Sequence, residues 1–291
     1  MGQKDLTEKN FLMYQDIYAD TLNVLAYAGR EVVLANELFP APTESFYQAD
    51  QEKLANQFND VSMYEMRNGS IRVQYILENE VRAKPRTILR KAGYEGALYR
   101  RQLESSEIYP VVSLLLYWGS APWKQPFSLK ELFEVLELDP DTWRFISNQK
   151  LHVYEMTRLP KQIRSRFQSD MRIVVDYLAE KQNYKPTRQR IINPEALLLM
   201  LKALTGDKRY TNILDAMSEE EKGGNITMCE LLDKYESRGI QKGIQKGIQQ
   251  AESRYAALTE KLIKTNRIDD LRRAAHSRKF RNQLYKEFGL V

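Results

Sequence analysis

Apolar and polar positions repeat with two different periods along the first third of the chain. Over residues 10–33 the apolar side chains recur at helical spacing, which predicts an amphipathic helix that breaks near Gly29. Residues 57–66 and 70–81 then have the composition of strands, and the 67–69 segment between them, Arg-Asn-Gly, contains the strongest short signal for a hairpin. We therefore expect two antiparallel strands after the first helix.

The middle of the chain alternates between helical and strand patterns. Helices are expected over 86–103 and 129–136, the continuous apolar run VVSLLLY after Pro110 fits a buried central strand, and a short strand is expected over 151–156. From Pro160 onward the pattern turns all-helical, with segments over 161–181, 194–204 and from 228 to the end. The sequence therefore predicts an α/β layer arrangement followed by an all-helical C-terminal region.

This order divides the chain into four expected parts. An α/β domain covers 1–184, with the main boundary near Tyr184, and is followed by a helical extension over 185–237 and a basic helical tail over 251–291. Residues 238–250, RGIQKGIQKGIQQ, carry a glycine every four residues, and each glycine costs a helix about 1 kcal/mol relative to alanine. We interpret this repeat as a flexible low-complexity spacer, the alternatives being a weak helix or a helix held by a partner.

The composition argues against a membrane protein, a secreted protein and a cysteine-based metal protein. With 43% hydrophobic and 29% charged residues, and with no apolar run approaching the roughly 20 residues of a membrane span, the chain has the profile of a soluble globular protein. The N-terminal segment MGQKDLTEKN lacks the apolar stretch of a signal peptide, so we expect a cytoplasmic protein with no membrane partner. Cys229 is the only cysteine, which excludes an internal disulfide and a cysteine-based zinc cluster.

Titratable side chains narrow the chemistry further. The two histidines, His152 and His276, are far apart in sequence and lack a second histidine or cysteine at helical or strand spacing. Catalysis by a Ser-His-Asp or Cys-His arrangement is therefore poorly supported, which leaves carboxylates, lysines and metals.

Positive charge is unevenly distributed although the net charge is only +5. Residues 81–103 hold seven basic side chains against the single acid Glu95, and residues 250–290 hold ten basic against five acidic side chains. A local excess of this size suits a bound polyanion, and the alternative is a solvated helix face.

Three carboxylates belong to the predicted hairpin. Glu78 and Glu80 project from one face of the second strand because strand side chains alternate. A hairpin turning on Asn68-Gly69 with strict pairing sets Asp60 opposite Leu77, on the other face. A single bulge or a one-residue slip would bring Asp60 to the face of Glu78. Clustered carboxylates repel unless a cation neutralises them, and oxygen ligands favour Mg²⁺ or Mn²⁺; the alternative is a solvated strand face.

The stretch ENEVRAKPRTILRKAGYEGALYRRQL, with NDVSMY before it and YPVVSLLLYWG after it, resembles the recombination-promoting nuclease (Rpn) family, a transposase-associated family of PD-(D/E)XK nucleases. In that family a strand aspartate is followed by a Glu-x-Gln strand motif, then by a helix rich in Arg, Tyr and Gln, then by an apolar strand. Asp60 matches the first acid and Glu78 the second. The segment YADTLNVLAYAG and the glycine repeat before a helical tail also match, so the resemblance touches most of the chain.

The resemblance implies a restriction-endonuclease-like core, a mixed sheet flanked by helices. It implies a Mg²⁺- or Mn²⁺-dependent endonuclease that hydrolyses DNA, with Asp60, Glu78 and Glu80 as catalytic residues. Metal ligands would be Asp60, Glu78 and, on the first helix, Asp20, where the class often places an acid; the alternative for Asp20 is a solvated surface position. Roles in recombination, in mobile elements and in defence are all compatible with the resemblance.

One position departs from the family pattern. The third motif residue, lysine in the class and commonly glutamine in the family, is Glu80 here, and a carboxylate cannot supply positive charge. We hypothesise that Arg82 or Lys84 supplies it, since both share the face of Glu80 if the strand continues that far. A nuclease fold that has lost activity and binds DNA or a protein partner is the alternative function.

The following helix carries the expected DNA-binding residues. Arg86, Arg90, Tyr94 and Arg101 share one face of that helix, where the arginines, with Arg82 and Lys84, would contact DNA phosphates. Tyr94 would stack or form a hydrogen bond, the alternative being packing in the core. A third possibility is a structural protein that forms homo-oligomers through the helical region 228–291.

Overall fold

The computed structural model describes residues 3–49, 53–58, 60–224 and 226–290. The chain forms two compact units, Met1–Cys229 and Glu230–Val291, which we describe separately. The first unit extends past Tyr184, where the main boundary was expected, because helix α7 (Pro194–Thr205) packs against α1 (Gln3–Leu12). The segment after Tyr184 therefore completes the first unit.

A five-stranded mixed sheet forms the centre of the first unit, which confirms the expected α/β class. Its spatial order is β1-β4-β5-β6-β7, in which β1, β4 and β5 pair antiparallel and β5, β6 and β7 pair parallel. The strands are Leu38–Pro40, Val61–Arg67, Ser70–Glu80, Val111–Tyr117 and Val153–Glu155. The apolar run 111–117 is an interior strand, as predicted.

The β4–β5 hairpin contains the bulge on which the carboxylate hypothesis depends. Asn68 (φ 53°) and Gly69 (φ 81°) form a turn with two positive φ angles, the geometry that Asn-Gly favours. Met66 pairs with Ile71, but Glu65 pairs with Val73, so Arg72 is the extra residue of β5. From Glu65 to Val61 the register is therefore shifted by one residue relative to the strict hairpin.

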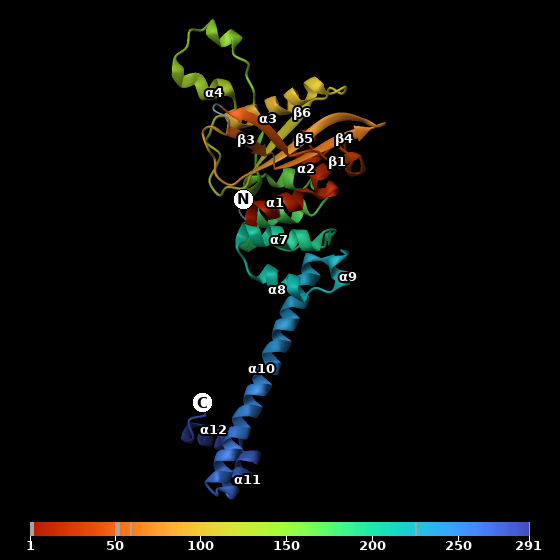
Figure 1. The fold of residues 1–291 in the computed structure, drawn as a ribbon. Coiled ribbons are helices and arrows are strands. Elements are labelled where there is room, and N and C mark those ends of the chain that lie inside the picture. Colours follow the sequence, from red (N-terminus) through yellow and green to blue (C-terminus); the bar gives the residue numbers. More distant parts are fainter. Residues whose placement is uncertain (1–2, 50–52, 59, 225, 291) are drawn as a thin grey trace. The chain divides into compact units, whose positions relative to one another are not determined.

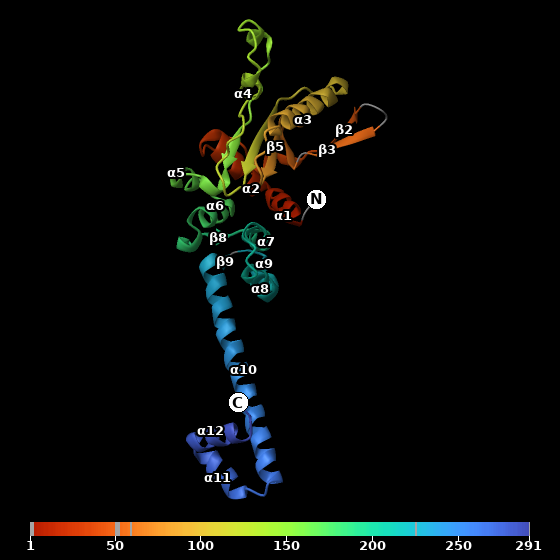
Figure 2. The same ribbon diagram turned by 90° about the vertical axis from the view of Figure 1, so that its left-hand side faces the viewer.

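Helices cover both faces of the sheet (Figures 1 and 2). On one face lies α2 (Gln15–Tyr27), where the Tyr27 hydroxyl is 2.8 Å from that of Tyr75 on β5. On the other face lies α3 (Thr87–Arg101), whose Ile88 packs in a cluster with side chains of β6. Glu78 and Glu80, two residues apart on β5, both face α3.

The predicted first helix is two helices in the structure. The chain turns between α1, which ends at Leu12, and α2, which begins at Gln15, so the helical region starts earlier than predicted. It ends where expected, because Ala28 (φ 57°) and Gly29 (φ 86°) adopt the left-handed conformation that terminates helices.

Two further differences concern strands. The run expected over 57–66 contains the end of β3 (Lys53–Phe58) and most of β4, with residue 59 outside the described part of the chain. Strand β3 pairs instead with β2 (Glu44–Ala49) in a separate two-stranded sheet. The short strands β8 (Arg190–Ile191) and β9 (Ile226–Thr227) also interrupt the region expected to be all-helical.

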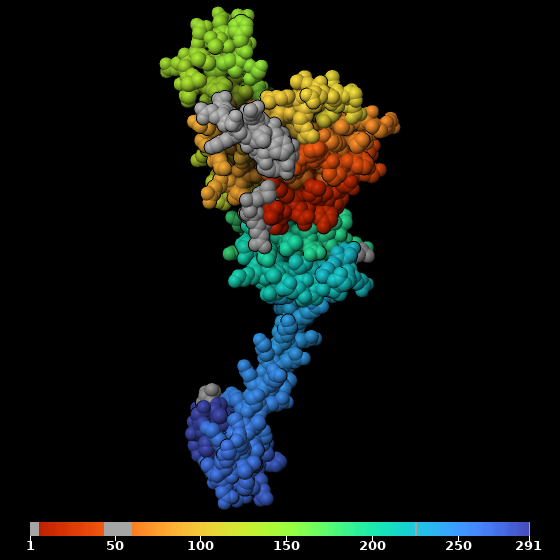
Figure 3. All heavy atoms as spheres, viewed as in Figure 1, coloured from red at the N-terminus to blue at the C-terminus, as the bar shows by residue number. Residues whose placement is uncertain are grey.

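Between β6 and β7 the chain makes a long excursion over residues 118–152 that contains α4 (Leu129–Phe133) and stands out from the rest of the first unit (Figure 3). Its base is anchored on α3, where the buried Lys91 ammonium donates to the carbonyl of Lys150 at 2.9 Å and lies 2.9 Å from Glu95. Helix α3 thus supports this excursion on one side and faces the carboxylates of β5 on another.

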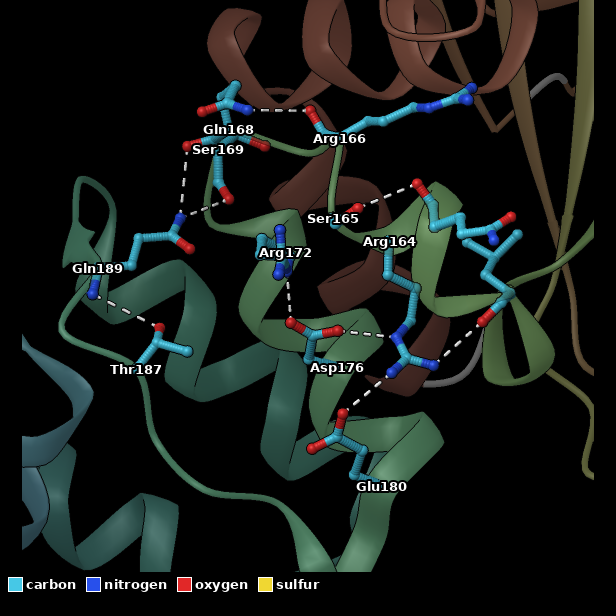
Figure 4. Close-up of polar contacts among 12 residues, drawn as sticks. Arg164, Ser165, Arg166, Gln168, Ser169, Arg172, Asp176, Glu180, Thr187 and Gln189 are labelled. Atoms are coloured by element: carbon cyan, nitrogen blue, oxygen red, sulfur yellow. Dashed lines mark hydrogen bonds and ion pairs between the residues drawn. The ribbon is translucent and has the colours of Figure 1, made fainter.

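The helix expected over 161–181 is broken into α5 (Lys161–Arg164) and α6 (Met171–Glu180). Arg164 joins the two pieces, because it bonds Asp176 at 2.7 Å and Glu180 at 3.0 Å (Figure 4). The helices α8 (Arg209–Ala216) and α9 (Glu219–Lys222) follow α7.

The second unit is helical. Helix α10 (Met228–Lys264) is followed by α11 (Ile268–His276) and α12 (Arg278–Glu287). Their core consists of Leu258, Leu262, Ala274, Leu284 and Tyr285. The 238–250 repeat lies inside α10, so the expected flexible spacer is wrong at the level of secondary structure. Within the described residues, none of the helices combines the length and the apolar character of a membrane span.

Candidate active site

Two of the predicted catalytic carboxylates lie at the carboxyl end of β5. Glu78 and Glu80 are both buried, at 4% and 9% exposure, on the face covered by α3. Asp60 reaches the same end of the sheet, where one of its oxygens accepts a hydrogen bond from the backbone N–H of Asn79 at 2.6 Å. The bulge at Arg72 makes this possible, because the shifted register continues from Val61 toward Asp60.

Helix α3 places a guanidinium group between the glutamates. Arg90 forms an ion pair with Glu80, and the same nitrogen lies 3.8 Å from a Glu78 oxygen. The Arg90 guanidinium also lies over the ring of Tyr94, 5.9 Å from its centroid. Arg90 and Tyr94, which we predicted as DNA-binding residues, are therefore part of the carboxylate cluster itself.

A further cation comes from a helix that the sequence did not reveal. Lys9 near the end of α1 lies 3.1 Å from the second oxygen of Asp60. The predicted helix began at Asn10, because the segment before it has only a weak apolar pattern. On the opposite face of β5, the indole N–H of Trp118 donates to the side-chain oxygen of Asn79 at 2.8 Å and so fixes the residue that binds Asp60.

Burial raises the pKa of the Glu78 carboxyl to about 7. The positive charge of Arg90 lowers this pKa, and the negative charge of Asp60 raises it. Within the part of the chain that the structure describes, one Glu78 oxygen has no hydrogen-bond partner. Burial also raises the pKa of the Tyr94 phenol, on which Glu78, Asp60 and Glu80 all act. The three acids and Tyr94 therefore share one electrostatic environment, and the phenol stays a neutral donor.

The fit of this cluster to a divalent cation depends on how many protein ligands the ion needs. Among the described residues there is no group of three or more His, Cys, Asp and Glu side chains arranged to hold a metal. Mg²⁺, however, is commonly bound by one or two carboxylates, with water and substrate phosphate completing its shell. Glu78 fits that smaller requirement through its buried oxygen without a partner, and Asp60 would bind the ion in place of its ion pair with Lys9.

Asp20, the third expected metal ligand, has a different position. One of its oxygens accepts hydrogen bonds from the backbone N–H groups of Gln168 and Ser169, at 2.9 and 2.8 Å, and from the Ser169 hydroxyl at 2.6 Å. These contacts hold the turn before α6, and they engage the carboxylate with residues other than Asp60 and Glu78. We therefore assign Asp20 a structural part.

The remaining predicted cations lie along the surface. Strand β5 ends at Glu80, so Arg82 and Lys84 do not continue its face, and both are exposed. The hypothesis that one of them supplies the missing positive charge required that continuation, and the cation that lies beside both glutamates is Arg90. Arg86 and Arg101 are exposed at the two ends of α3, where a bound polyanion has access to them.

The fold and the site together define a mixed α/β domain with a cluster of carboxylates and cations where its parallel strands end. Comparison of the chain with models of known families, with curated proteins and with solved structures finds no match.

Proposed function

We propose that the first unit is a restriction-endonuclease-like domain of the PD-(D/E)XK class, similar to the Rpn family, that hydrolyses phosphodiester bonds in DNA with Mg²⁺ or Mn²⁺. The observation that carries this proposal is the Glu78 carboxylate, buried with one oxygen unpartnered and near Asp60 at the carboxyl end of a parallel strand pair. Ligand sites of open α/β sheets lie at that end. The α/β class and the helices on both faces of the sheet agree with such a core.

In this proposal Asp60 and Glu78 hold the metal ion. A bound ion would lower the pKa of a water ligand toward neutrality and offset negative charge on the phosphate. Arg90 neutralises Glu80, so this departure from the class motif does not add an uncompensated negative charge. The guanidinium beside Glu78 then supplies the positive charge that a lysine supplies elsewhere, and Tyr94 offers its phenolic proton to a phosphate oxygen.

A specific observation favours a second candidate, a nuclease fold that binds DNA or a protein partner without cutting. The carboxylates already have cationic neighbours, Lys9 beside Asp60 and Arg90 beside the two glutamates. A site in which every carboxylate is compensated needs no metal for its stability. Salt-sensitive DNA binding without cleavage in Mg²⁺ or Mn²⁺ would select this candidate.

The experiment is cleavage of supercoiled plasmid DNA by purified full-length protein with Mg²⁺, Mn²⁺ or excess EDTA. Asp60→Asn and Glu78→Gln should each lower the rate by about 100-fold or more. Asp141→Asn is the control, because that acid is 80% exposed on the excursion of the same unit. Equal rates for all four proteins would refute the assignment of the site, and absence of cleavage by the wild type in every metal would refute the activity.

A further inference from the structure

The two units differ in charge. The second unit, residues 230–291, has 14 basic and 8 acidic side chains, whereas the preceding 229 residues have 30 basic and 31 acidic ones. The net charge of +5 therefore originates entirely in the smaller unit. A concentration of one sign in a compact domain attracts molecules of the opposite sign.

Within the second unit the charge is concentrated further. Residues 271–286, which cover most of α11 and α12, contain six basic side chains and no acid. We call this stretch the basic α11–α12 segment. Five of its cations are exposed: Arg272, Arg273, Arg278, Lys279 and Lys286.

Part of this charge serves the unit's own packing. Arg281 lies over the ring of Tyr255 at 5.6 Å and donates to the carbonyl of Ala274 at 3.1 Å, and Arg273 lies over the ring of Phe280 at 4.3 Å. In the described part of the unit, by contrast, Lys279 and Lys286 have no acid within ion-pair distance. They are seven residues apart and thus share one face of α12.

The segment lacks the second feature of a membrane-surface helix, an exposed apolar face. Ala274, Leu284 and Tyr285 are buried in the core of the unit, and Phe280 packs against that core. Between residues 265 and 290 only Ile268 is a large exposed hydrophobic side chain, at 40%. Helices that bind membranes by lying in the interface need such a face, whereas binding to a phosphate backbone requires cations alone.

We propose that the basic α11–α12 segment binds the phosphate backbone of DNA without regard to base sequence, as a binding surface separate from the carboxylate cluster. The binding itself is independent of the proposed nuclease function. Only its consequence, that the second unit adds affinity for the DNA cut by the first, rests on that function.

The test compares two pairs of substitutions in the full-length protein. Lys279→Gln with Lys286→Gln removes two cations of the segment, and Lys242→Gln with Lys246→Gln removes two exposed lysines of α10 in the same unit. The two pairs change the same residue type and the same net charge. Affinity for a labelled DNA duplex is measured by fluorescence anisotropy over a range of salt concentrations with EDTA present, so that no cleavage occurs. Circular dichroism confirms that each protein keeps its helices.

Each phosphate contact contributes about −0.9 to the slope of log affinity against log salt concentration. The first pair should therefore reduce the magnitude of the slope by about 2 and weaken binding at low salt by about 10-fold or more, while the second pair leaves the slope unchanged. An equal effect of both pairs, or no effect of the first, would overturn the proposal.

Two further measurements separate the remaining outcomes. If the first pair weakens binding to vesicles containing phosphatidylserine but leaves DNA binding intact, the segment binds membranes and the proposal is wrong. If wild-type protein binds DNA through the segment but does not cleave it in Mg²⁺ or Mn²⁺, the nuclease function fails while this inference stands.

Discussion

Arg90 on α3 forms an ion pair with Glu80 on β5, and this pair joins the helix proposed to face DNA to the strand that carries the candidate metal ligands. Replacing Arg90 by glutamine leaves two buried glutamates without their cation. Because the charge of Arg90 lowers the pKa of Glu78, its loss leaves that carboxyl protonated to higher pH; we therefore expect cleavage near neutral pH to fall at least about 10-fold and half-maximal cleavage to require more Mg²⁺.

Arg86→Gln is the matched control for this prediction. Arg86 is the N-cap residue of α3, four residues before Arg90, and is exposed, and the substitution removes the same charge. Similar metal dependence in the two variants would show that Arg90 acts only as one of several surface cations.

For Asp20 we expect an effect on stability and none on cleavage. Because its carboxylate holds the turn at Gln168 and Ser169, Asp20→Ala, which removes the hydrogen-bond acceptor, should lower the free energy of unfolding by about 1–3 kcal/mol and leave cleavage per folded molecule unchanged. Urea unfolding followed by tryptophan fluorescence measures the first quantity, since Trp118, Trp123 and Trp143 all lie in the first unit. Loss of cleavage without loss of stability would restore Asp20 as a ligand.

Removing only one partner of the buried ion pair between Lys91 and Glu95 should lower the free energy of unfolding. Their side chains are 4% and 14% exposed, so Lys91→Met leaves an uncompensated carboxylate and should cost about 3 kcal/mol. The double variant Lys91→Met with Glu95→Leu should recover much of that loss, because it removes the charge as well. Lys124→Met, at an exposed position, serves as the control. A double variant as unstable as the single one would contradict the account.

Asp170 should make stability depend on pH. It is fully buried and accepts a hydrogen bond from the backbone N–H of Asn193 at 2.6 Å, and burial raises its pKa from 3.8 to about 6. The folded state therefore holds the proton more tightly than the unfolded state. The stability that this provides is complete below pH 3.8 and is lost as the pH rises through 6.

The Asp170→Asn variant lacks this titration. Its free energy of unfolding, measured relative to wild type, should improve by up to about 3 kcal/mol between pH 4 and pH 7. Unfolding curves at several pH values, followed by tryptophan fluorescence, give this difference directly. A constant difference across that range would contradict the prediction.

The glycines of α10 provide a prediction on the second unit. A methyl group added at Gly239, Gly243 or Gly247 meets no atom within 4 Å, so each Gly→Ala change should stabilise the helix by up to about 1 kcal/mol. Thermal melting followed by circular dichroism at 222 nm measures the effect. Gly69→Ala should do the reverse in the first unit, because Gly69 has φ +81°. Destabilisation by the α10 substitutions would indicate a partner packed closely on the glycines.

Local chemistry explains which parts of the fold could be predicted. The Asn68-Gly69 turn and the apolar run 111–117 depend on backbone conformation and on burial, which neighbouring residues determine. The sequence shows that a bulge would bring Asp60 and Glu78 to one face, but it does not show where the bulge lies. Arg72 is an ordinary strand residue, and the position of the bulge depends on packing across the sheet. Helix α1 was missed for a similar reason, since it is stabilised by contacts with α7 rather than by a strong pattern of its own.

The candidate site was predictable only where the family resemblance supplied residues. Asp60 and Glu78 were named from it, but the cations around them come from elements whose approach no local pattern encodes. Lys9 is about fifty residues from Asp60 in the chain. The sequence places Arg90 on one face of a helix but does not show that this face lies against the glutamates of β5. The glycine repeat is helical in the structure although a flexible spacer was expected. Helix propensities of single residues do not include the support that a segment receives from helical turns on both sides.

Because of the bulge at Arg72, the number of residues between Asp60 and Glu78 determines whether the two acids lie on the same face of the hairpin. Inserting or deleting one residue between Asp60 and Glu78 exchanges the inner and outer faces of one strand, whereas a change of two residues restores them. Related sequences that keep both acids on one face should therefore differ in this interval by even numbers, or by paired single changes that cancel. The length of the hairpin, as much as the identity of its acids, then determines whether the two carboxylates lie on one face.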